Sequence, residues 1–346
     1  MQQFLKQLST FLIIALIPLL LVTIGYFAND PFSVLKPRKN FYNLSVVSNR
    51  DYVSTEMFIK NYPIYHYNSF IFGSSRTLGY RPMSWIKYLQ SDAVPFVFDA
   101  SGESVYGIYM KLKYLQRNNI PIKNALIILD RDLSFDNNKN HKGHLFIKHP
   151  LTSQESNFDF QLEFYKAYLN PKFLFNFYNY KFSGQYKPFM KGFIESRNVL
   201  FDTVTNQIVL ADEDKAILEN PKKYYEDRKS SLLKSGSERT DDMRRIHKKE
   251  NELLLGIKTV LEAEHTEFKV IISPLYEQIK LHRSDDSILT AIFGKKFYNF
   301  SGKNSFTDNK TNYYEANHFT PKAGETILKT IYLTDTNTLH NKLLLF

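Results

Sequence analysis

Four short apolar runs, separated by stretches with helical patterning, constrain the fold of this chain more than any other feature. The runs are Ser69–Phe72, Pro95–Asp99, Ala125–Asp130 and Phe268–Leu275. They do not alternate with polar residues, as expected of strands that are buried on both faces. Helices are predicted around them, over Ser84–Gln90, Ser104–Asn118 and Glu238–His265. The sequence therefore predicts an α/β fold with a doubly wound parallel sheet.

A long insertion separates the third run from the fourth. Residues 136–237 break the strand–helix rhythm and contain the stretch Phe158–Phe182, whose aromatic residues recur at nearly helical spacing. We expect this insertion to form a helical, aromatic cap subdomain with its own small core, which would shape a substrate groove. The predicted α/β domain then comprises residues 66–135 and 238–346. Residues 31–65, which contain three prolines, are expected to be an irregular linker.

The first thirty residues contain an apolar segment long enough to cross a membrane. No residue from Gln7 to Asn29 is charged, and Phe11–Ala28 is almost wholly apolar. About 20 such residues span a bilayer, whereas a cleaved signal peptide has an apolar region of about 7–15 residues and a small-residue cleavage site. A cleaved signal peptide is the alternative. We expect residues 1–30 to be an uncleaved signal anchor with one transmembrane helix.

Composition excludes several classes of site. The chain has no Cys, which excludes disulfides, Cys–zinc sites, iron–sulfur clusters and a thiol nucleophile. No glycine-rich phosphate loop follows the first run, so we expect no nucleotide and no other cofactor. The net charge of +10 comes from basic residues scattered along the chain, so nucleic acid is not an expected partner. The aromatic content of 15% suits either a sugar-stacking surface or a Phe- and Tyr-rich core, and we favour the core.

A serine and a histidine near opposite ends of the chain predict a nucleophilic site. The first run ends in Gly73-Ser74-Ser75-Arg76, which places Ser75 at the carboxyl edge of the sheet, where ligands of open α/β sheets bind. Glu315 and His318 are three residues apart, just before a helix predicted to begin at Thr320-Pro321. Within one local turn, the carboxylate can hold one imidazole nitrogen while the other nitrogen faces a serine.

These motifs resemble those of the SGNH/GDSL hydrolase superfamily, which has a flavodoxin-like α/β fold. Gly73-Ser74-Ser75 is similar to the block that carries the nucleophile of that family. Glu315-Ala316-Asn317-His318 is similar to its D-x-x-H block, with Glu in place of Asp. The resemblance implies a triad of Ser75, His318 and Glu315. It is strongest to membrane-anchored branches that modify cell-envelope polymers, such as alginate O-acetyltransferase-like and lipoteichoic acid D-alanylation-like proteins.

The oxyanion hole that the resemblance implies is matched only in part. Gly102 fits the glycine whose amide contributes to the hole after the second strand. The family has an asparagine after the next strand, but this chain has Asp130-Arg131-Asp132, and the nearest asparagine is Asn137. Loss of such a donor costs about 2.7–4 kcal/mol of transition-state stabilisation. The oxyanion or substrate-binding candidates are Gly102, Arg76 and Asp130. Arg76 or Arg131 could replace the missing asparagine as a hydrogen-bond donor, or either could equally be an ion-paired scaffold residue.

Two other clusters have structural explanations. His141, His144 and His149 could bind a metal, but their stretch is loop-like, lysines lie beside it and helical H-E-x-x-H spacing is absent. We therefore expect no metal site. The aspartates within Asp130–Asp136 are typical of a turn that follows a strand.

The resemblance implies an esterase or O-acyltransferase, with acetyl the expected group, acting on a cell-envelope or extracellular polysaccharide. Both reactions use the same acyl-enzyme, and the transferase would need a membrane partner that supplies the acyl group. The alternative is a catalytically inactive protein of the same fold that binds a glycan or assembles a polysaccharide synthesis complex. An envelope substrate implies an extracytoplasmic domain, periplasmic or extracellular. The charge count opposes it, because Lys36, Arg38 and Lys39 follow the anchor and only Lys6 precedes it.

Overall fold

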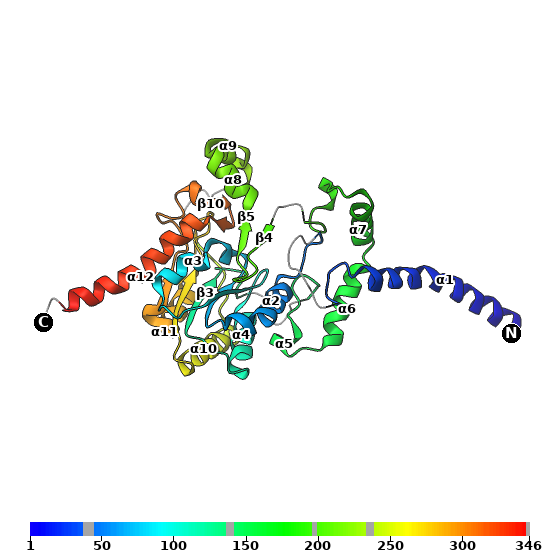
Figure 1. The fold of residues 1–346 in the computed structure, drawn as a ribbon, viewed down its shortest axis with the longest axis horizontal. Coiled ribbons are helices and arrows are strands. Elements are labelled where there is room, and N and C mark those ends of the chain that lie inside the picture. Colours follow the sequence, from blue (N-terminus) through cyan, green and yellow to red (C-terminus); the bar gives the residue numbers. More distant parts are fainter. Residues whose placement is uncertain (37–44, 136–141, 196–198, 233–238, 344–346) are drawn as a thin grey trace.

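A wholly parallel, five-stranded sheet forms the centre of the molecule (Figure 1). The computed structural model describes residues 1–36, 45–135, 142–195, 199–232 and 239–343. The sheet has the order β2-β1-β3-β7-β9, one of the common orders of doubly wound sheets. Its strands are β1 (Ser69–Gly73), β2 (Pro95–Asp99), β3 (Asn124–Leu129), β7 (Glu267–Ile272) and β9 (Phe297–Asn299). The predicted α/β fold with a parallel sheet is confirmed. The edge strand β9 lies outside the predicted runs because three residues give too short a pattern.

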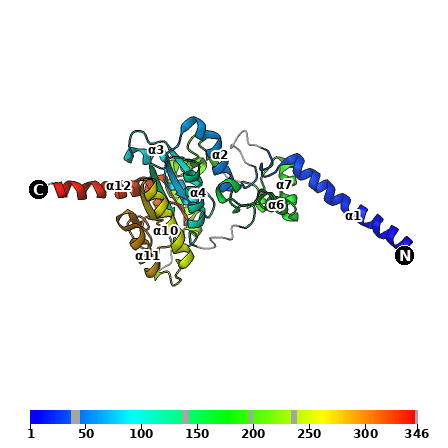
Figure 2. The ribbon, with the colours of Figure 1, turned by 90° about the horizontal axis from the view of Figure 1, so that it is seen from below.

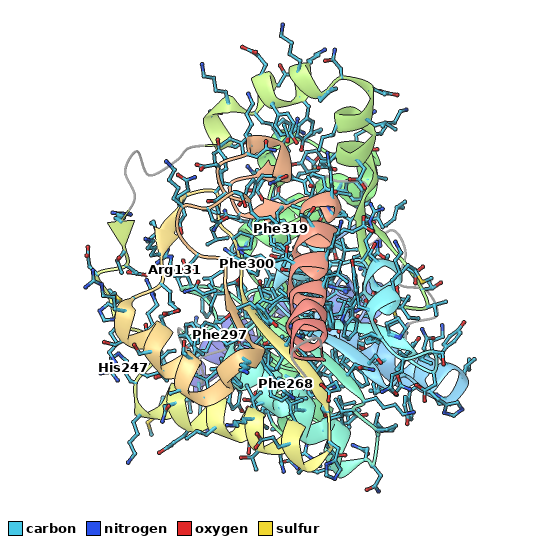
Figure 3. The ribbon with its side chains drawn as sticks, turned by 90° about the vertical axis from the view of Figure 1, so that its left-hand side faces the viewer. Arg131, His247, Phe268, Phe297, Phe300 and Phe319 are labelled. Carbon is cyan, nitrogen blue, oxygen red and sulfur yellow. The ribbon has the colours of Figure 1, made fainter. Side chains whose placement is uncertain are left out.

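Alternate residues of the central strands enter two hydrophobic cores. On one face, the Phe residues of β1 and β2 pack against helices α2 (Arg50–Tyr65), α4 (Val105–Arg117), α10 (Lys248–Ala263) and α11 (Arg283–Phe293). On the other face, Ile71, Val97 and Ile128 pack against α3 (Pro82–Trp85) and α12 (Pro321–Leu343). Figure 3 views the molecule from the α12 side, with Phe319 beside the start of that helix. Burial of both faces explains why the strands do not alternate in polarity.

The N-terminal helix α1 (Gln2–Asn29) projects away from the rest of the molecule (Figures 1 and 2). Its most apolar 18-residue window has a mean hydropathy of 2.6, and 7% of that window is buried. Among the described residues, it is the one helix long and apolar enough to span a membrane. Its last turns contact the globular part, through Val22, Thr23, Tyr26 and Asn29.

The expected linker contains a helix that belongs to the α/β domain, and the prediction of irregular structure is therefore wrong over residues 50–65. Helix α2 buries most of its length against β2. It begins where Asn49 accepts a hydrogen bond from the amide of Tyr52 at 2.9 Å, and Asp51 lies in its first turn. Pro63, which favoured a linker, lies in the last turn of the helix.

The insertion forms two separate parts instead of one cap. The first part, here called the aromatic module, comprises α5 (Pro150–Ser153), α6 (Asn157–Tyr168), α7 (Pro171–Ser183) and the chain up to Glu195, and it packs against the end of α1. The second, here called the lid, comprises the hairpin of β4 (Val199–Phe201) and β5 (Ile208–Leu210) with helices α8 (Ala211–Glu219) and α9 (Pro221–Asp227). In Figure 1, α6 and α7 lie beside α1, whereas α8 and α9 lie near β10.

Short elements complete the fold. Strand β6 (Arg239–Thr240) pairs with β8 (Ile279–Lys280), and β10 (Tyr313–Glu315) pairs with β11 (His318–Phe319) in an antiparallel hairpin. Helix α10 begins after His247, labelled in Figure 3, and is shorter than predicted because β6 and a turn occupy residues 239–247.

Candidate active site

Three side chains meet at the carboxyl edge of the sheet. The imidazole Nε2 of His318 lies 2.8 Å from the Oγ of Ser75. The Nδ1 of the same ring hydrogen-bonds the carboxylate of Glu315. The other oxygen of Glu315 accepts a hydrogen bond from the amide of Asn317 at 2.9 Å. The structure thus brings together the serine, histidine and acid that the sequence singles out, in the connectivity of a Ser–His–acid triad.

Local structure explains how residues 243 positions apart come into contact. Ser75 opens a 3₁₀ turn directly after β1, and its neighbour Ser74 caps that turn. Glu315 and His318 face each other across the β10–β11 hairpin. The next residue, Phe319, is 1% exposed and packs against Tyr80, beyond the end of the turn that begins at Ser75. The hairpin is therefore docked against the turn that carries the serine.

The surroundings keep Glu315 ionised. Burial alone would raise the pKa of this carboxyl, but the hydrogen bond and charge of His318, the amide of Asn317 and the charge of Arg76 hold it below its usual range. An ionised Glu315 accepts the Nδ1–H of His318 and leaves Nε2 free to accept the serine proton. The side chains of Glu315 and His318 are 34% and 26% exposed, so a substrate can reach them.

The other predicted site residues lie behind the triad. Arg76 forms an ion pair with Asp130, and both side chains are almost fully buried. Arg131 is held by Asp241 and Glu277, at the place labelled in Figure 3. These pairs give all three residues scaffold contacts, and none of them lines the pocket at Ser75. The expectation that either arginine replaces the missing oxyanion donor finds no support in this geometry, because each guanidinium already faces a carboxylate.

Gly102 occupies a turn after β2 with a φ of 56°, in the left-handed region that favours glycine. A Cβ there would meet only the ring of Phe146, at 3.6 Å. The pocket is lined by the preceding Ser101 rather than by Gly102 itself. Asn137, the nearest asparagine after the third strand, lies outside the described residues.

A pocket of about 300 Å³ opens beside Ser75 and is closed on one side by the lid. The hairpin β4–β5 supplies apolar wall residues, including Phe201 and Leu210. Helix α8 contributes Glu213, and the chain after α9 contributes Arg228, whose guanidinium lies 3.8 Å from the centre of the Tyr224 ring. The wall therefore combines an apolar surface with both signs of charge. The residues of this wall could not be predicted from the sequence, because the lid comes next to the triad only in the folded chain.

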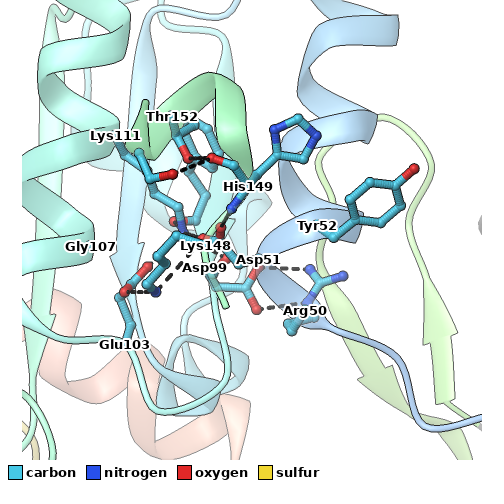
Figure 4. A network of polar contacts seen from close by, with 12 residues as sticks. Arg50, Asp51, Tyr52, Asp99, Glu103, Gly107, Lys111, Lys148, His149 and Thr152 are labelled. Atoms are coloured by element: carbon cyan, nitrogen blue, oxygen red, sulfur yellow. Dashed lines mark hydrogen bonds and ion pairs between the residues drawn. The ribbon is translucent and has the colours of Figure 1, made fainter. Parts of the chain in front are cut away.

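A buried arginine forms another part of this wall. Arg50 donates to both carboxylate oxygens of Asp99, at 2.9 and 2.7 Å, and to the side-chain oxygen of Asn206 at 2.6 Å. Figure 4 shows the Arg50–Asp99 pair at the end of β2. The pair ties α2 and the lid hairpin to the sheet edge that carries the pocket. The capping residue Asn49 was the one sequence signal that could have placed Arg50 at a helix start.

A second buried network lies next to it (Figure 4). The ammonium of Lys111 contacts Asp51 at 2.8 Å and Glu103 at 2.6 Å, and Lys148 also pairs with Glu103. Burial alone would raise the pKa of Asp51 and Glu103, but Lys111 and Lys148 hold both below their usual range. Lys111 also donates to the backbone oxygen of Asp99 at 2.9 Å, so this network supports the turn below the pocket.

The histidines of the insertion have structural contacts. His144 packs against Phe32, with the ring centres 5.0 Å apart, and burial lowers its pKa. His149 caps α5 and lies 3.1 Å from Glu56. His141 and Asp136 lie outside the described residues. Among the residues that the structure describes, no three His, Asp or Glu side chains are placed to hold a metal ion.

Comparison with known proteins adds no further information to this geometry. Neither the protein-family models nor the curated proteins compared with the chain give a match. The features that bear on function are therefore the contacts of Ser75, His318 and Glu315 and the pocket beside them.

Proposed function

We propose that the chain is a membrane-anchored serine esterase or O-acyltransferase of the SGNH type, with Ser75 as nucleophile. The observation that carries the proposal is the 2.8 Å contact between His318 Nε2 and Ser75 Oγ, with Glu315 on the other ring nitrogen. A serine in hydrogen-bond reach of an imidazole, itself oriented by a carboxylate, is the recurring arrangement of an activated nucleophile. The flavodoxin-like strand order, with the serine after the first strand, agrees with this assignment.

The reaction follows from the positions of these groups. Ser75 Oγ attacks an ester carbonyl while His318 Nε2 takes the serine proton, and a tetrahedral oxyanion forms. Collapse of that intermediate breaks the ester bond, and His318 protonates the departing alcohol. The acyl group is then on Ser75. Water or an acceptor alcohol gives its proton to His318, attacks the acyl-enzyme and releases the serine. Glu315 orients and stabilises the imidazolium in both halves.

The backbone is the expected source of oxyanion stabilisation. The amide of Ser75 and the amides of the turn at Ser101 and Gly102 lie at the same sheet edge as the nucleophile, since Gly73 and Asp99 are paired ends of β1 and β2. Backbone donors of this kind stabilise the oxyanion without a dedicated side chain. In this proposal, Arg76 and Asp130 hold the turn of Ser75 in place.

The proposed substrate is an acylated polysaccharide outside the cytoplasm. The pocket offers an apolar hairpin for an acyl group, while Glu213, Arg228 and the ring of Tyr224 suit a hydroxyl-rich, charged group. Helix α1 would anchor the protein in the membrane, with the catalytic domain on the extracytoplasmic side. A topology reporter fused at Phe346 tests this orientation, and reporter activity in the cytoplasm would contradict it.

Active-site labelling tests the chemistry directly. The full chain is treated with a fluorophosphonate and examined by intact mass and peptide mapping. A single adduct on Ser75 is expected, and it should be lost in His318→Ala because the serine then has no base. Absence of an adduct on the folded protein would instead favour a glycan-binding or assembly protein of the same fold.

Hydrolysis and transfer are separated by the acceptor. The protein is given an acetylated glycan with and without an added alcohol. A transferase forms the new ester and releases less free acetate when the acceptor is present, whereas a hydrolase turns over in water and ignores the acceptor. Ser75→Ala should abolish both outcomes.

A further inference from the structure

Helix α7 presents apolar side chains on two opposite faces. Phe173 and Phe177 are buried in the core of the aromatic module. Phe175 and Phe182, seven residues apart and therefore on one helical stripe, are 62% and 82% exposed. The chain after the helix adds Phe189, which is 51% exposed and packs 5.8 Å from Phe175. A second apolar face is typical of a helix that contacts another apolar surface, and this second face of α7 is exposed in the protein.

The charge of this segment is also unusual. From Asn170 to Ile194 the chain has four lysines, nine Phe or Tyr residues and no Asp or Glu. Lysines that flank exposed aromatic rings are typical of segments that lie at the surface of an anionic bilayer. The neighbouring helix α6 differs, because it carries Asp159 and Glu163. The basic aromatic surface is therefore confined to α7 and the chain that follows it.

Contacts with α1 place this surface at a defined depth. The hydroxyl of Thr23 lies 2.6 Å from that of Tyr165, and the ring of Tyr26 lies 5.2 Å from that of Tyr168. Asn29, at the end of α1, hydrogen-bonds Lys181. Gly25 permits the close approach, since a Cβ there would meet the hydroxyls of Tyr168 and Tyr178 at 2.8 and 2.7 Å. These contacts fix the C-terminal half of α7 beside the end of the apolar run of α1, where a bilayer meets water.

The apolar surface of α1 continues into the module. A hollow of about 470 Å³ is lined by Leu16, Ile17, Leu19, Leu20, Thr23 and Tyr165. Figures 1 and 2 both show α7 next to the inner end of α1. We propose that α7 and the chain to Phe193 lie in the headgroup layer of the bilayer that α1 crosses, with Phe175, Phe182 and Phe189 inserted and the lysines contacting anionic phosphates. The proposal rests on the proposed membrane anchor and is independent of the acyl chemistry.

This arrangement holds the pocket near the membrane surface. The amide of Val47 donates to the backbone oxygen of Phe193 at 3.0 Å, and Val46 and Ile194 form a β-bridge. Val47, Ser48 and Glu195, at this junction, line the pocket of the candidate triad. A module lying on the bilayer would therefore hold one wall of the pocket at a constant height above the headgroups.

Fluorescence quenching by brominated lipids tests the proposal on the full chain. The native Trp85, the single tryptophan, is fully buried and provides a constant background. Phe182→Trp and Phe175→Trp are reconstituted in vesicles of phosphatidylcholine and phosphatidylglycerol with bromine near the headgroup end of the acyl chains. We expect the added emission to shift to the blue and to lose most of its intensity. The matched control is Leu218→Trp on α8, where Leu218 is 84% exposed, and it should be unquenched.

The outcomes separate the possible failures. Phe182→Trp emission as unquenched as that of Leu218→Trp, in protein that floats with the vesicles, would overturn the proposal while leaving the anchor intact. Protein that does not float would overturn the anchor and the proposal together. Equal quenching in vesicles of phosphatidylcholine alone would overturn the role given to the lysines. Fluorophosphonate labelling of Ser75 in the same samples reports on the proposed reaction independently.

Discussion

Two groups of ionisable side chains lie at the same edge of the sheet and differ in one respect, their access to solvent. In the buried network, the side chains of Asp51, Glu103, Lys111 and Lys148 are at most 3% exposed. In the triad, Glu315 and His318 are 34% and 26% exposed. The buried network satisfies its charges internally and holds α2, α4 and the turn after β2 together. The triad leaves Ser75 open to the pocket, and in the proposed mechanism its imidazole becomes charged only during the reaction.

This contrast predicts that changes in the two groups affect different quantities. A triad substitution should reduce activity and leave the free energy of unfolding almost unchanged, because the groups removed are partly solvated. A substitution in the buried network should reduce the free energy of unfolding, because it leaves an unpaired charge in the interior. Trp85, fully buried against the sheet, is a native probe for the unfolding measurements.

The largest expected effect is on activity in Ser75→Ala. Without the hydroxyl, no acyl-enzyme forms, and kcat for an acetyl ester should fall by a factor on the order of 10⁴–10⁶. The denaturant midpoint should match that of the wild type. The control is Ser287→Ala on α11, which removes an exposed serine remote from the pocket and should retain full activity. Retained turnover in Ser75→Ala would exclude the triad mechanism.

Glu315→Gln should have the next largest effect. The amide no longer enforces the imidazole tautomer that accepts the serine proton, so kcat should fall by about 10⁴-fold. Glu315→Asp keeps the charge with a shorter arm and should recover part of the lost activity. The two variants are compared by kcat at saturating ester and by the rate of fluorophosphonate labelling. Similar activity in both would show that the carboxylate charge does not act through His318.

Sequence alone predicted the triad because each part is encoded locally. Ser75 follows a recognisable strand, and Glu315 and His318 fall within one short hairpin. The walls of the pocket could not be predicted in the same way. Arg50 and Glu213 reach the pocket from segments 163 positions apart in the chain, and only folding of the lid over the sheet edge brings them to it.

In the buried network, Lys111→Met should lower the free energy of unfolding by about 3–5 kcal/mol, since it leaves buried carboxylates without their principal partner. The matched control is Lys123→Met, which removes a surface ion pair with Asp92 whose side chains are 46% and 56% exposed. That change should have a much smaller effect, because solvent screens an exposed ion pair. Urea unfolding followed by Trp85 fluorescence measures both. Equal losses would mean that burial of the Lys111 network does not determine its contribution.

The sequence predicted those parts of the fold that have a strong local pattern. Four of the five strands follow from apolar runs, because burial on both faces leaves a strong composition signal. The division of the insertion was not predicted, because composition, aromatic in the first part and highly charged in the second, does not show which element each part packs against. Contact with α1 distinguishes the aromatic module, and contact with Tyr314 distinguishes the lid. The linker prediction failed at α2 because Pro63 is compatible with its last turn.

The smallest expected effect is on the pH dependence of the free energy of unfolding. This dependence distinguishes the buried network from the triad. The pKa values of Asp51 and Glu103 are lower in the folded protein than usual, so the unfolded chain takes up protons first as the pH falls. Their contribution is therefore complete above the unfolded values of about 4 and declines as the pH drops towards the folded values, by at most about 1.4 kcal/mol per pH unit for each carboxylate. Lys111→Met should flatten this decline, whereas Ser75→Ala should leave it unchanged. Unfolding curves between pH 3 and 7 measure the slopes, and an unchanged slope in Lys111→Met would show that the carboxylates do not depend on that lysine.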